Sequence, residues 1–330
     1  MADLRIICWN IQDLGIAQMA DLNFEKILVE VIHKNQAHVV CILETKGCQG
    51  VVLKDALKTG LSSKTGKTWA GEHSVRSGPK SNKPEEYVFV WDTTVVTGNS
   101  FHIPDHAQDP AYPKSGYGFI NTHLKSRYPY VGKFTVNARS ITIVAFHTCF
   151  ETKHIVNSNQ NLAQIKAVID DPNVIIMGDF NDSATGGKAG KGKKKSFDYL
   201  YEMGPEAACH YVCALDVETS LKSPKNADSG SWGTTADVRA SKYDHFFWRS
   251  VTGQLSAPTA TVIDVIADLR DGQYLHDLGK AAFNKWTSLP NSKGTAFGPG
   301  AKITSVQEAH LVYASAISDH LPVFMQITVN

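Results

Sequence analysis

The chain has 330 residues, of which 42% are hydrophobic and 20% are charged, and its formal net charge is +1. This composition predicts a globular protein with a sizeable core and excludes a disordered chain. The near-neutral net charge excludes a protein whose whole surface is basic, so any attraction for phosphate must come from a local group of charges.

The N-terminal half predicts strands and helices in close succession. Leu4 to Trp9 is apolar on both alternating faces except at Arg5, which indicates a strand covered on both sides. Apolar residues at helical spacing predict an amphipathic helix over 21–34. We further expect a buried strand over 37–43, a short helix over 51–58 closing at Gly60, an exposed loop over 61–84, strands over 87–91 and at 95–96, and an irregular segment over 100–116.

The C-terminal half is less uniform. The pattern predicts strands over 141–146, 174–177, 246–248 and 321–327, and an amphipathic helix over 159–169. Residues 252–304 give a weak signal, and Val262 to Leu269 fits a helix or a strand. No run of 18 apolar residues occurs, so we expect no membrane span. The first nine residues resemble a core strand and not a signal peptide, which favours a cytoplasmic protein over a secreted mature form with an added Met.

One motif, Gly178-Asp179-Phe180-Asn181, directly follows a buried apolar strand. Gly178 allows a close turn, and an extended backbone would point Asp179 and Asn181 the same way. Together they could hold a phosphate or a metal-bound water. A simple turn after a core strand is the alternative, since Asp and Asn are common there.

A glycine-rich segment over 183–195 follows this motif and contains five lysines. A solvated loop and a contact with a phosphate backbone explain it equally well.

Polar residues end several other predicted strands. Buried carboxylates cost free energy unless they are paired or bind cations, so a repeated pattern of this kind is hard to explain by packing. Two histidines with several carboxylates are what metal-assisted phosphoester hydrolysis requires. The residues are Asn10, Glu44, Glu85, His147, Asp179 with Asn181, Asp244, and Asp319 with His320.

These motifs resemble those of the endonuclease/exonuclease/phosphatase superfamily, and their spacing is most similar to the DNase I-like branch. The resemblance implies an α/β fold, a four-layer sandwich of two mainly antiparallel sheets face to face with helices on the outer faces. The matching pieces, in family order, are Trp9-Asn10-Ile11, Leu43-Glu44-Thr45, Glu85-Glu86-Tyr87, Arg127-Tyr128-Pro129, Phe146-His147, Gly-Asp-Phe-Asn at 178–181, Tyr243-Asp244 and Ser318-Asp319-His320-Leu321-Pro322-Val323.

The resemblance also implies a role for each residue. Glu44 is the principal metal ligand, supported by Asn10 and Asp319, and the ion is Mg²⁺, with Mn²⁺ or Ca²⁺ as alternatives. The catalytic residues are two carboxylate–histidine pairs and the two residues that position phosphate and water. These are His147 held by Glu85, His320 held by Asp244, and Asp179 with Asn181. Either Asp179 or His320 could activate the water.

Phosphate contacts are expected from Arg127, Lys46, Lys193 and Lys194. Two departures from the family pattern bear on the substrate. Lys46 takes the place of an Arg in the DNase I-like branch and lacks its bidentate fork. Gln12 takes the place of an acidic residue in the AP endonucleases, which weakens that assignment.

The leading functional hypothesis is a Mg²⁺-dependent nuclease that hydrolyses phosphodiester bonds of DNA with little sequence preference. The alternatives are a phosphodiesterase or phosphatase for a phospholipid or inositol phosphate, and a binding protein without activity. We expect one domain over 1–330, a monomer, and an insertion within 252–310, because the 74 residues between Asp244 and Asp319 exceed what DNase I-like chains need.

Overall fold

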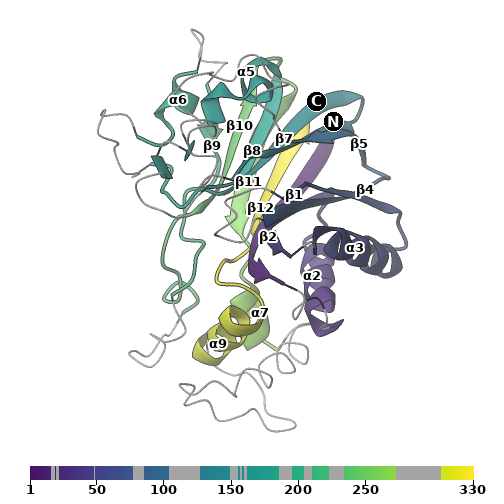
Figure 1. Cartoon of the computed structure of the whole chain (residues 1–330), viewed down its shortest axis with the longest axis vertical. Helices are drawn as coiled ribbons and strands as arrows, with labels where there is room; N and C mark the ends of the chain where they lie inside the picture. The colour runs from purple at the N-terminus through teal and green to yellow at the C-terminus, as the bar shows by residue number, and fades with distance from the viewer. Residues whose placement is uncertain are drawn as a thin grey trace.

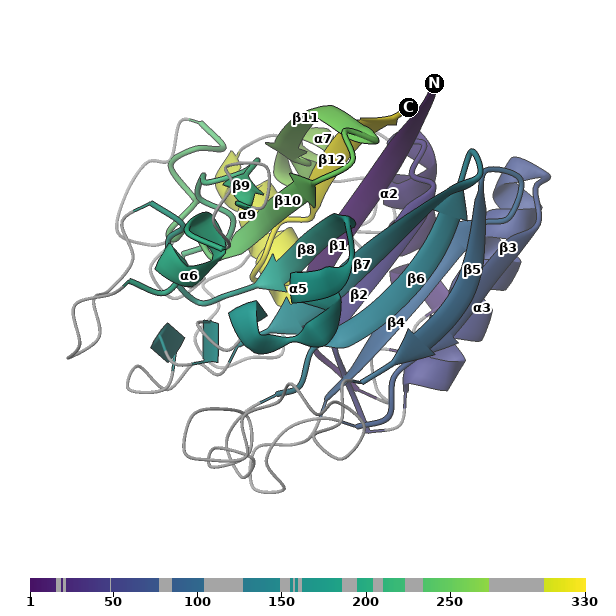
Figure 2. The same ribbon diagram turned by 90° about the horizontal axis from the view of Figure 1, so that it is seen from above.

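Two six-stranded sheets pack face to face in the computed structural model, and helices lie on their outer faces (Figures 1 and 2). The structure describes residues 1–15, 19, 22–47, 49–76, 85–103, 127–148, 155–156, 158–159, 162–185, 195–203, 210–222, 234–272 and 306–330.

The first sheet has the strand order β11-β12-β1-β2-β4-β3. Its neighbours are antiparallel except for β1 and β2, which run in parallel. The strands are β1 (Ala2–Leu14), β2 (Val39–Lys46), β3 (Trp69–His73), β4 (Glu85–Asp92), β11 (Leu255–Val262) and β12 (Val323–Val329).

The second sheet has the order β5-β6-β7-β8-β10-β9, and β7 and β8 are its parallel pair. Its strands are β5 (Val96–His102), β6 (Tyr130–Val136), β7 (Arg139–His147), β8 (Asn173–Asp179), β9 (Val212–Cys213) and β10 (Asp244–Ser250).

Helices cover both outer faces, so the protein has four layers (Figure 2). The outer face of the first sheet and the helices over it share one apolar core, the second sheet has a similar outer core, and a third core fills the space between the sheets. Burying each large apolar side chain contributes roughly 1.5–3 kcal/mol. The four-layer α/β sandwich is therefore confirmed. The helices are α2 (Leu22–Lys34), α3 (Gly50–Thr65), α7 (Val265–Arg270) and α9 (Val306–Ala316) on the first sheet, and η2 (Leu162–Gln164), α5 (Lys166–Asp170) and α6 (Asp198–Tyr201) on the second.

Helix α3 is longer than the sequence pattern predicts. It continues through Gly60 and ends at Gly66, whose φ of 69° gives the left-handed cap. Gly60 serves close packing: a Cβ there would lie 2.7 Å from the Val29 side chain of α2. The predicted end at Gly60 is wrong, and so is the loop over 61–73, which is helix followed by β3.

The continuous helix predicted over 159–169 is also wrong, because the segment is broken into two short elements. A 3₁₀ turn, η2, is separated from the short α5 by Ile165, whose ψ of 126° is extended. The pattern missed β6 and α9 altogether. In the ambiguous segment, Val262 ends strand β11 and residues 265–270 form α7, so the sequence there encodes both kinds of element.

Some expectations fall outside the described residues, among them Lys193 and Lys194, most of the 183–195 segment, and residues 273–305 of the expected insertion. The described part of that insertion supplies β11, α7 and the start of α9. No helix among the described residues is long and apolar enough to cross a membrane.

Gly178 is required by the close approach of β7 to β8. Its φ is 151°, and a Cβ there would lie 1.7 Å from the carbonyl oxygen of Phe146.

We expect Gly178→Ala to lower the free energy of unfolding by about 3 kcal/mol or more, because the neighbour is backbone and cannot move aside. Urea unfolding measures this change. Gly66→Ala is the matched control: its Cβ meets open space, so only left-handed strain of roughly 1–2 kcal/mol is expected. Equal losses for both variants would contradict the steric account.

His310 on α9 gives a pH-dependent contribution to stability. It is buried, its Nε2 donates to the carbonyl of Lys222 at 3.0 Å, and burial lowers its pKa to about 4. The unfolded chain, with a pKa near 6.5, binds more protons between these values, so stability falls as pH drops from about 6.5 to about 4.

Over this range we expect the wild type to lose about 3 kcal/mol more than His310→Gln, which cannot titrate. Urea unfolding of both proteins at a series of pH values tests this. Parallel pH profiles would show that His310 carries no such linkage.

Candidate active site

The ends of six strands meet at one end of the sandwich and carry the predicted polar side chains. β1, β2, β7 and β8 reach this end with their C-termini, whereas the antiparallel β4 and β10 begin there. In register, His147 pairs with Asp179, and Asp179 pairs with Asp244. The topology therefore places residues far apart in the sequence side by side.

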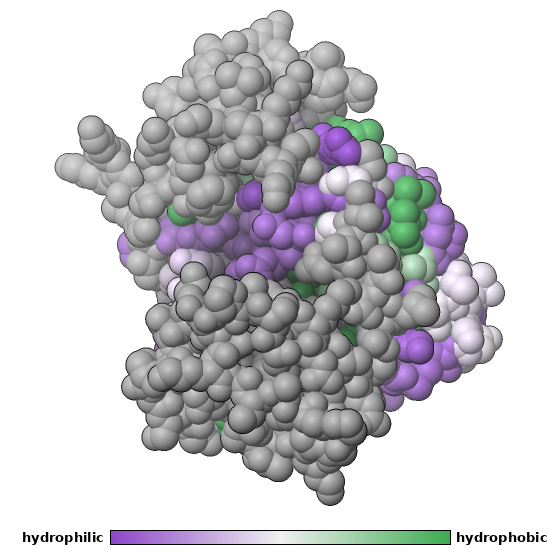
Figure 3. Space-filling view, turned by 60° about the horizontal axis from the view of Figure 1, so that its bottom comes forward, coloured by the Kyte–Doolittle hydropathy of each residue, from purple (hydrophilic) through white to green (hydrophobic). Residues whose placement is uncertain are grey.

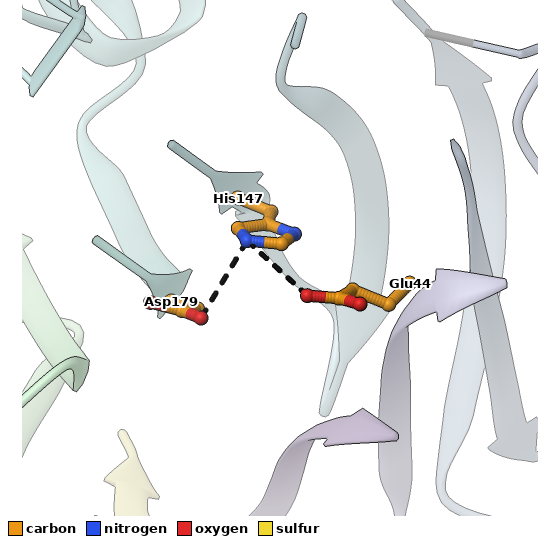
Figure 4. Close-up of side chains that lie close together, drawn as sticks. All are labelled: Glu44, His147 and Asp179. Atoms are coloured by element: carbon orange, nitrogen blue, oxygen red, sulfur yellow. Dashed lines mark ion pairs between the residues drawn. The ribbon is translucent and has the colours of Figure 1, made fainter. Parts of the chain in front are cut away.

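Asp179 lies at the centre of this cluster. One of its carboxylate oxygens, Oδ2, lies 3.5 Å from Nε2 of His147 and 3.7 Å from Nε2 of His320. The same oxygen accepts a hydrogen bond from Nδ2 of Asn10 at 2.9 Å. Glu44 lies on the other side of His147, with 3.5 Å between its Oε1 and Nε2 (Figure 4). One buried carboxylate thus faces both histidines.

His147 is held by Glu85 and is neutral. Its Nδ1 lies 2.9 Å from Oε2 of Glu85, and its Nε2 lies 3.0 Å from Nη1 of Arg127. Burial, with the Arg127 charge second, lowers the pKa of His147 to about 4. Nδ1 therefore carries the proton and donates it to Glu85, and Nε2 accepts from Nη1 of Arg127.

His320 has the opposite character. Its Nδ1 lies 2.7 Å from Oδ2 of Asp244. Burial alone would lower its pKa, but the charges of Asp244 and Asp179 raise that pKa well above the usual value. The imidazolium form is therefore favoured, and its Nε2–H is directed toward Asp179.

Glu44 occupies a strained position. Its φ is 64°, unusual for a residue with a side chain, and the β1–β2 and β2–β4 registers both shift beside it. A bulge of this kind re-aims a side chain at the end of a strand. Burial raises the pKa of Glu44, and the adjacent His147 reduces this shift. Such strain, of the order of 1 kcal/mol or more, typically persists where a side chain must reach a functional site.

Arg127 and Lys46 are bound by carboxylates within the site. Nη2 of Arg127 donates to Oε1 of Glu85 at 2.5 Å, and Nη1 donates to the carbonyl of Thr148 at 3.0 Å. Lys46 pairs with Asp13, and its Nζ lies 3.5 Å from Glu85 and 3.7 Å from Glu44. In this arrangement both cations neutralise the acidic cluster.

Asn10 and Asn181 orient their neighbours. Nδ2 of Asn10 donates to both Glu44 and Asp179, and its Oδ1 accepts from the amide of Gln12 at 3.0 Å. Asn181 has a φ of 51°, not the extended backbone that was predicted. Its amide N–H donates to Oδ1 of Asp179 at 2.9 Å. Asp319 lies at the rim, with its Oδ1 3.9 Å from Nε2 of His320 and a 40% exposed side chain.

The donor set fits a divalent cation. Glu44, His147 and Asp179 each offer one atom, and these atoms lie within 4.8 Å of one another. Asp179, Asp244 and His320 form a second group that meets the same criterion. Two carboxylates brought this close repel each other, and a hard cation that takes oxygen ligands would relieve the repulsion.

Three supporting residues were given no role by the sequence, although two of them, Tyr87 and Ser318, lie within the matching motifs. The amide N–H of His147 donates to the hydroxyl of Tyr87 at 3.1 Å. Thr219 accepts from the amide N–H of Asp244 at 3.0 Å. Ser318 donates to the carbonyl of Asn10 at 2.6 Å, which ties the loop before β12 to β1.

When the bottom of the molecule in Figure 1 is turned forward, a band of hydrophilic surface is visible among the described residues (Figure 3). Such a band suits a polar or ionic substrate better than an apolar one.

Solved structures of endonuclease/exonuclease/phosphatase proteins have a similar fold. One is the endonuclease/exonuclease/phosphatase family protein from Bacteroides thetaiotaomicron, with a TM-score of 0.58 and 13% identity over 100% of this chain and 98% of that one. D. rerio TDP2, complexed with single strand DNA product, has a TM-score of 0.53 and 11% identity over 100% of both chains. The human Nocturnin catalytic domain, with bound sulfate, has a TM-score of 0.51 and 11% identity over 99% of this chain and 95% of that one. No protein-family model and no curated protein matches the sequence.

Proposed function

We propose that this protein is a Mg²⁺-dependent nuclease that hydrolyses phosphodiester bonds of DNA with little sequence preference. The observation that carries the proposal is the position of Asp179, whose Oδ2 faces Nε2 of both His147 and His320. The carboxylate of Asp179 can accept a proton, and the imidazolium of His320 beside it can donate one, so the pair can serve proton transfer.

Each residue then has a chemical task. Glu44 and Asp179 would hold Mg²⁺, which when bound polarises the phosphoryl group. His320, oriented by Asp244, donates its Nε2 proton to the leaving oxygen. Asp179, held by the Asn181 amide, orients the attacking water and accepts its proton. His147, fixed by Glu85, lies with its Nε2 beside the same carboxylate and accepts there from Arg127.

DNA as the substrate is supported by one fold relative that was solved with a single strand DNA product. Lys46, Arg127, Lys193 and Lys194 remain the proposed phosphate contacts. Such contacts position a backbone without reading its sequence. To bind a phosphate, Arg127 and Lys46 would have to give up some of their present contacts with carboxylates.

A substrate panel tests the proposal. Purified protein is incubated with plasmid DNA, single-stranded DNA, RNA, an inositol phosphate and a phospholipid vesicle, each with Mg²⁺ or EDTA. We expect Mg²⁺-dependent nicking of DNA that falls steeply as salt rises. His147→Ala and His320→Ala serve as inactive controls. Turnover of the lipid or inositol phosphate without cleavage of DNA would replace the nuclease assignment by that of a phosphatase or phosphodiesterase for those substrates.

A further inference from the structure

A cavity of about 430 Å³ lies beside the candidate active site, between the edge strands of the two sheets. β3 is the edge of the first sheet and β5 the edge of the second, and both lie at the same side of the sandwich (Figure 2). The cavity is lined by side chains of these strands and of the start of β6. Its volume is in the usual range for sites that bind small molecules.

Two aromatic rings connect this cavity to the catalytic residues. Tyr130, which lines it, stacks on Tyr87 with ring centroids 6.2 Å apart and an interplanar angle of 23°. The hydroxyl of Tyr87 accepts a hydrogen bond from the amide of His147. Ser74, also in the lining, accepts from the amide of Tyr87 at 2.9 Å. A ligand in the cavity would therefore be separated from His147 by the rings of Tyr130 and Tyr87.

The lining is unsuited to phosphate. The described residues that line it include no lysine or arginine, and they include the carboxylate of Glu72, which repels anions. Its remaining polar groups are uncharged or weakly basic, such as Asn99, His73 and His102. These described residues therefore favour a neutral or cationic group over the phosphodiester itself.

The same lining suits a planar ring with hydrogen-bonding edges. Phe101 and Tyr130 offer aromatic surface. Nδ1 of His73 is buried and has no hydrogen-bond partner among the described residues. A buried polar atom without a partner costs about 1–3 kcal/mol, which a ligand group would recover. Asn99 uses its Nδ2 on Thr135 at 2.8 Å, and its side-chain oxygen adds an acceptor to the lining.

We propose that this cavity binds a nucleobase of the substrate strand, next to the cleaved phosphodiester. The proposal rests on the proposed nuclease function and deepens it by assigning a base subsite to the sheet edges. Aromatic side chains bind bases of any sequence by stacking, so such a subsite adds affinity without strict sequence preference.

Oligonucleotide binding tests the subsite without requiring catalysis. A fluorescent single-stranded oligonucleotide is titrated in EDTA against the wild type, His73→Ala and Phe101→Ala, and Kd is measured by anisotropy. A base contact is worth about 1–3 kcal/mol, so we expect each variant to weaken binding by about 5- to 100-fold. Thr97→Ala, an exposed change elsewhere on β5, should leave Kd unchanged.

A strand with single abasic positions separates loss of the subsite from a damaged fold. In the wild type, one abasic position should weaken binding as much as His73→Ala does. In His73→Ala, that same abasic strand should bind no worse than the intact strand, since the contact is already lost. Additive losses, or variants within twofold of the wild type, would overturn the proposal. Hydrolysis of bis(p-nitrophenyl) phosphate by the wild type reports separately on the proposed chemistry.

Discussion

Replacement of Asp179 by Asn is expected to reduce kcat for DNA cleavage by about 1,000-fold or more. The carboxylate is placed to orient water, to hold the cation and to face both imidazoles, and a neutral amide cannot accept the proton. The amide also meets Asn10, whose Nδ2 donates to Oδ2 of Asp179 at 2.9 Å. Two donors would then face each other unless one side chain turns over.

Steady-state kinetics at saturating Mg²⁺ measure this effect, and circular dichroism checks the fold. Asp3→Asn is the matched control, because Asp3 lies at the opposite end of β1 and bonds Gln326 and Thr328. We expect the control to keep wild-type kcat. If Asp179→Asn retained more than a tenth of the activity, Asp179 could not have the central role assigned to it.

The second large effect concerns His320. His320→Gln can still donate from a side-chain N–H toward Asp179, but it cannot release a proton at neutral pH. General acid catalysis typically contributes 100- to 10,000-fold, so kcat should fall by about that factor. KM should change little, because the histidine acts on the leaving oxygen and is not a main source of ground-state affinity.

His33→Gln, the same change on the exposed C-terminal turn of α2, is the control for this experiment. A substrate with a good leaving group, such as bis(p-nitrophenyl) phosphate, should lose less activity than DNA, because its leaving oxygen needs little protonation. An equal loss on both substrates would argue that His320 positions the site and does not act as the acid.

The sequence predicts many of the strands because the signals for them are local, whereas the sandwich itself is implied by the family resemblance. Short β-branched runs covered on both faces, such as Val174 to Met177, are typical of buried strands. The polar residues at the ends of these runs converge because parallel and antiparallel pairing bring the correct ends together. Strand geometry also explains why Glu85, and not its neighbour Glu86, is the partner of His147. Successive strand residues face opposite sides, so Glu85 bonds His147 and Glu86 bonds the Gly50 amide.

Other features depend on contacts that no local pattern encodes. Gly60 looks like a helix end, but it allows α3 to approach Val29 closely. Asn181 is not extended, because its backbone amide donates a hydrogen bond to the Asp179 carboxylate. Arg127 is predicted as a phosphate contact, but the sequence does not show that it is buried against Glu85 and His147. In each case a tertiary contact decides between conformations or roles that the sequence leaves open.

The central claim is that Glu44, His147, Asp179 and His320 act together around a divalent cation to break a P–O bond. Its most direct test is the rate of DNA cleavage by purified protein as a function of Mg²⁺ concentration, for the wild type and for Glu44→Gln. We expect no cleavage in EDTA, saturable activation by Mg²⁺ in the wild type, and activation shifted to at least tenfold higher Mg²⁺ in the variant, since loss of one charged ligand removes about 1.4 kcal/mol or more of binding. Cleavage that persists in EDTA, or the same Mg²⁺ dependence in both proteins, would contradict this account.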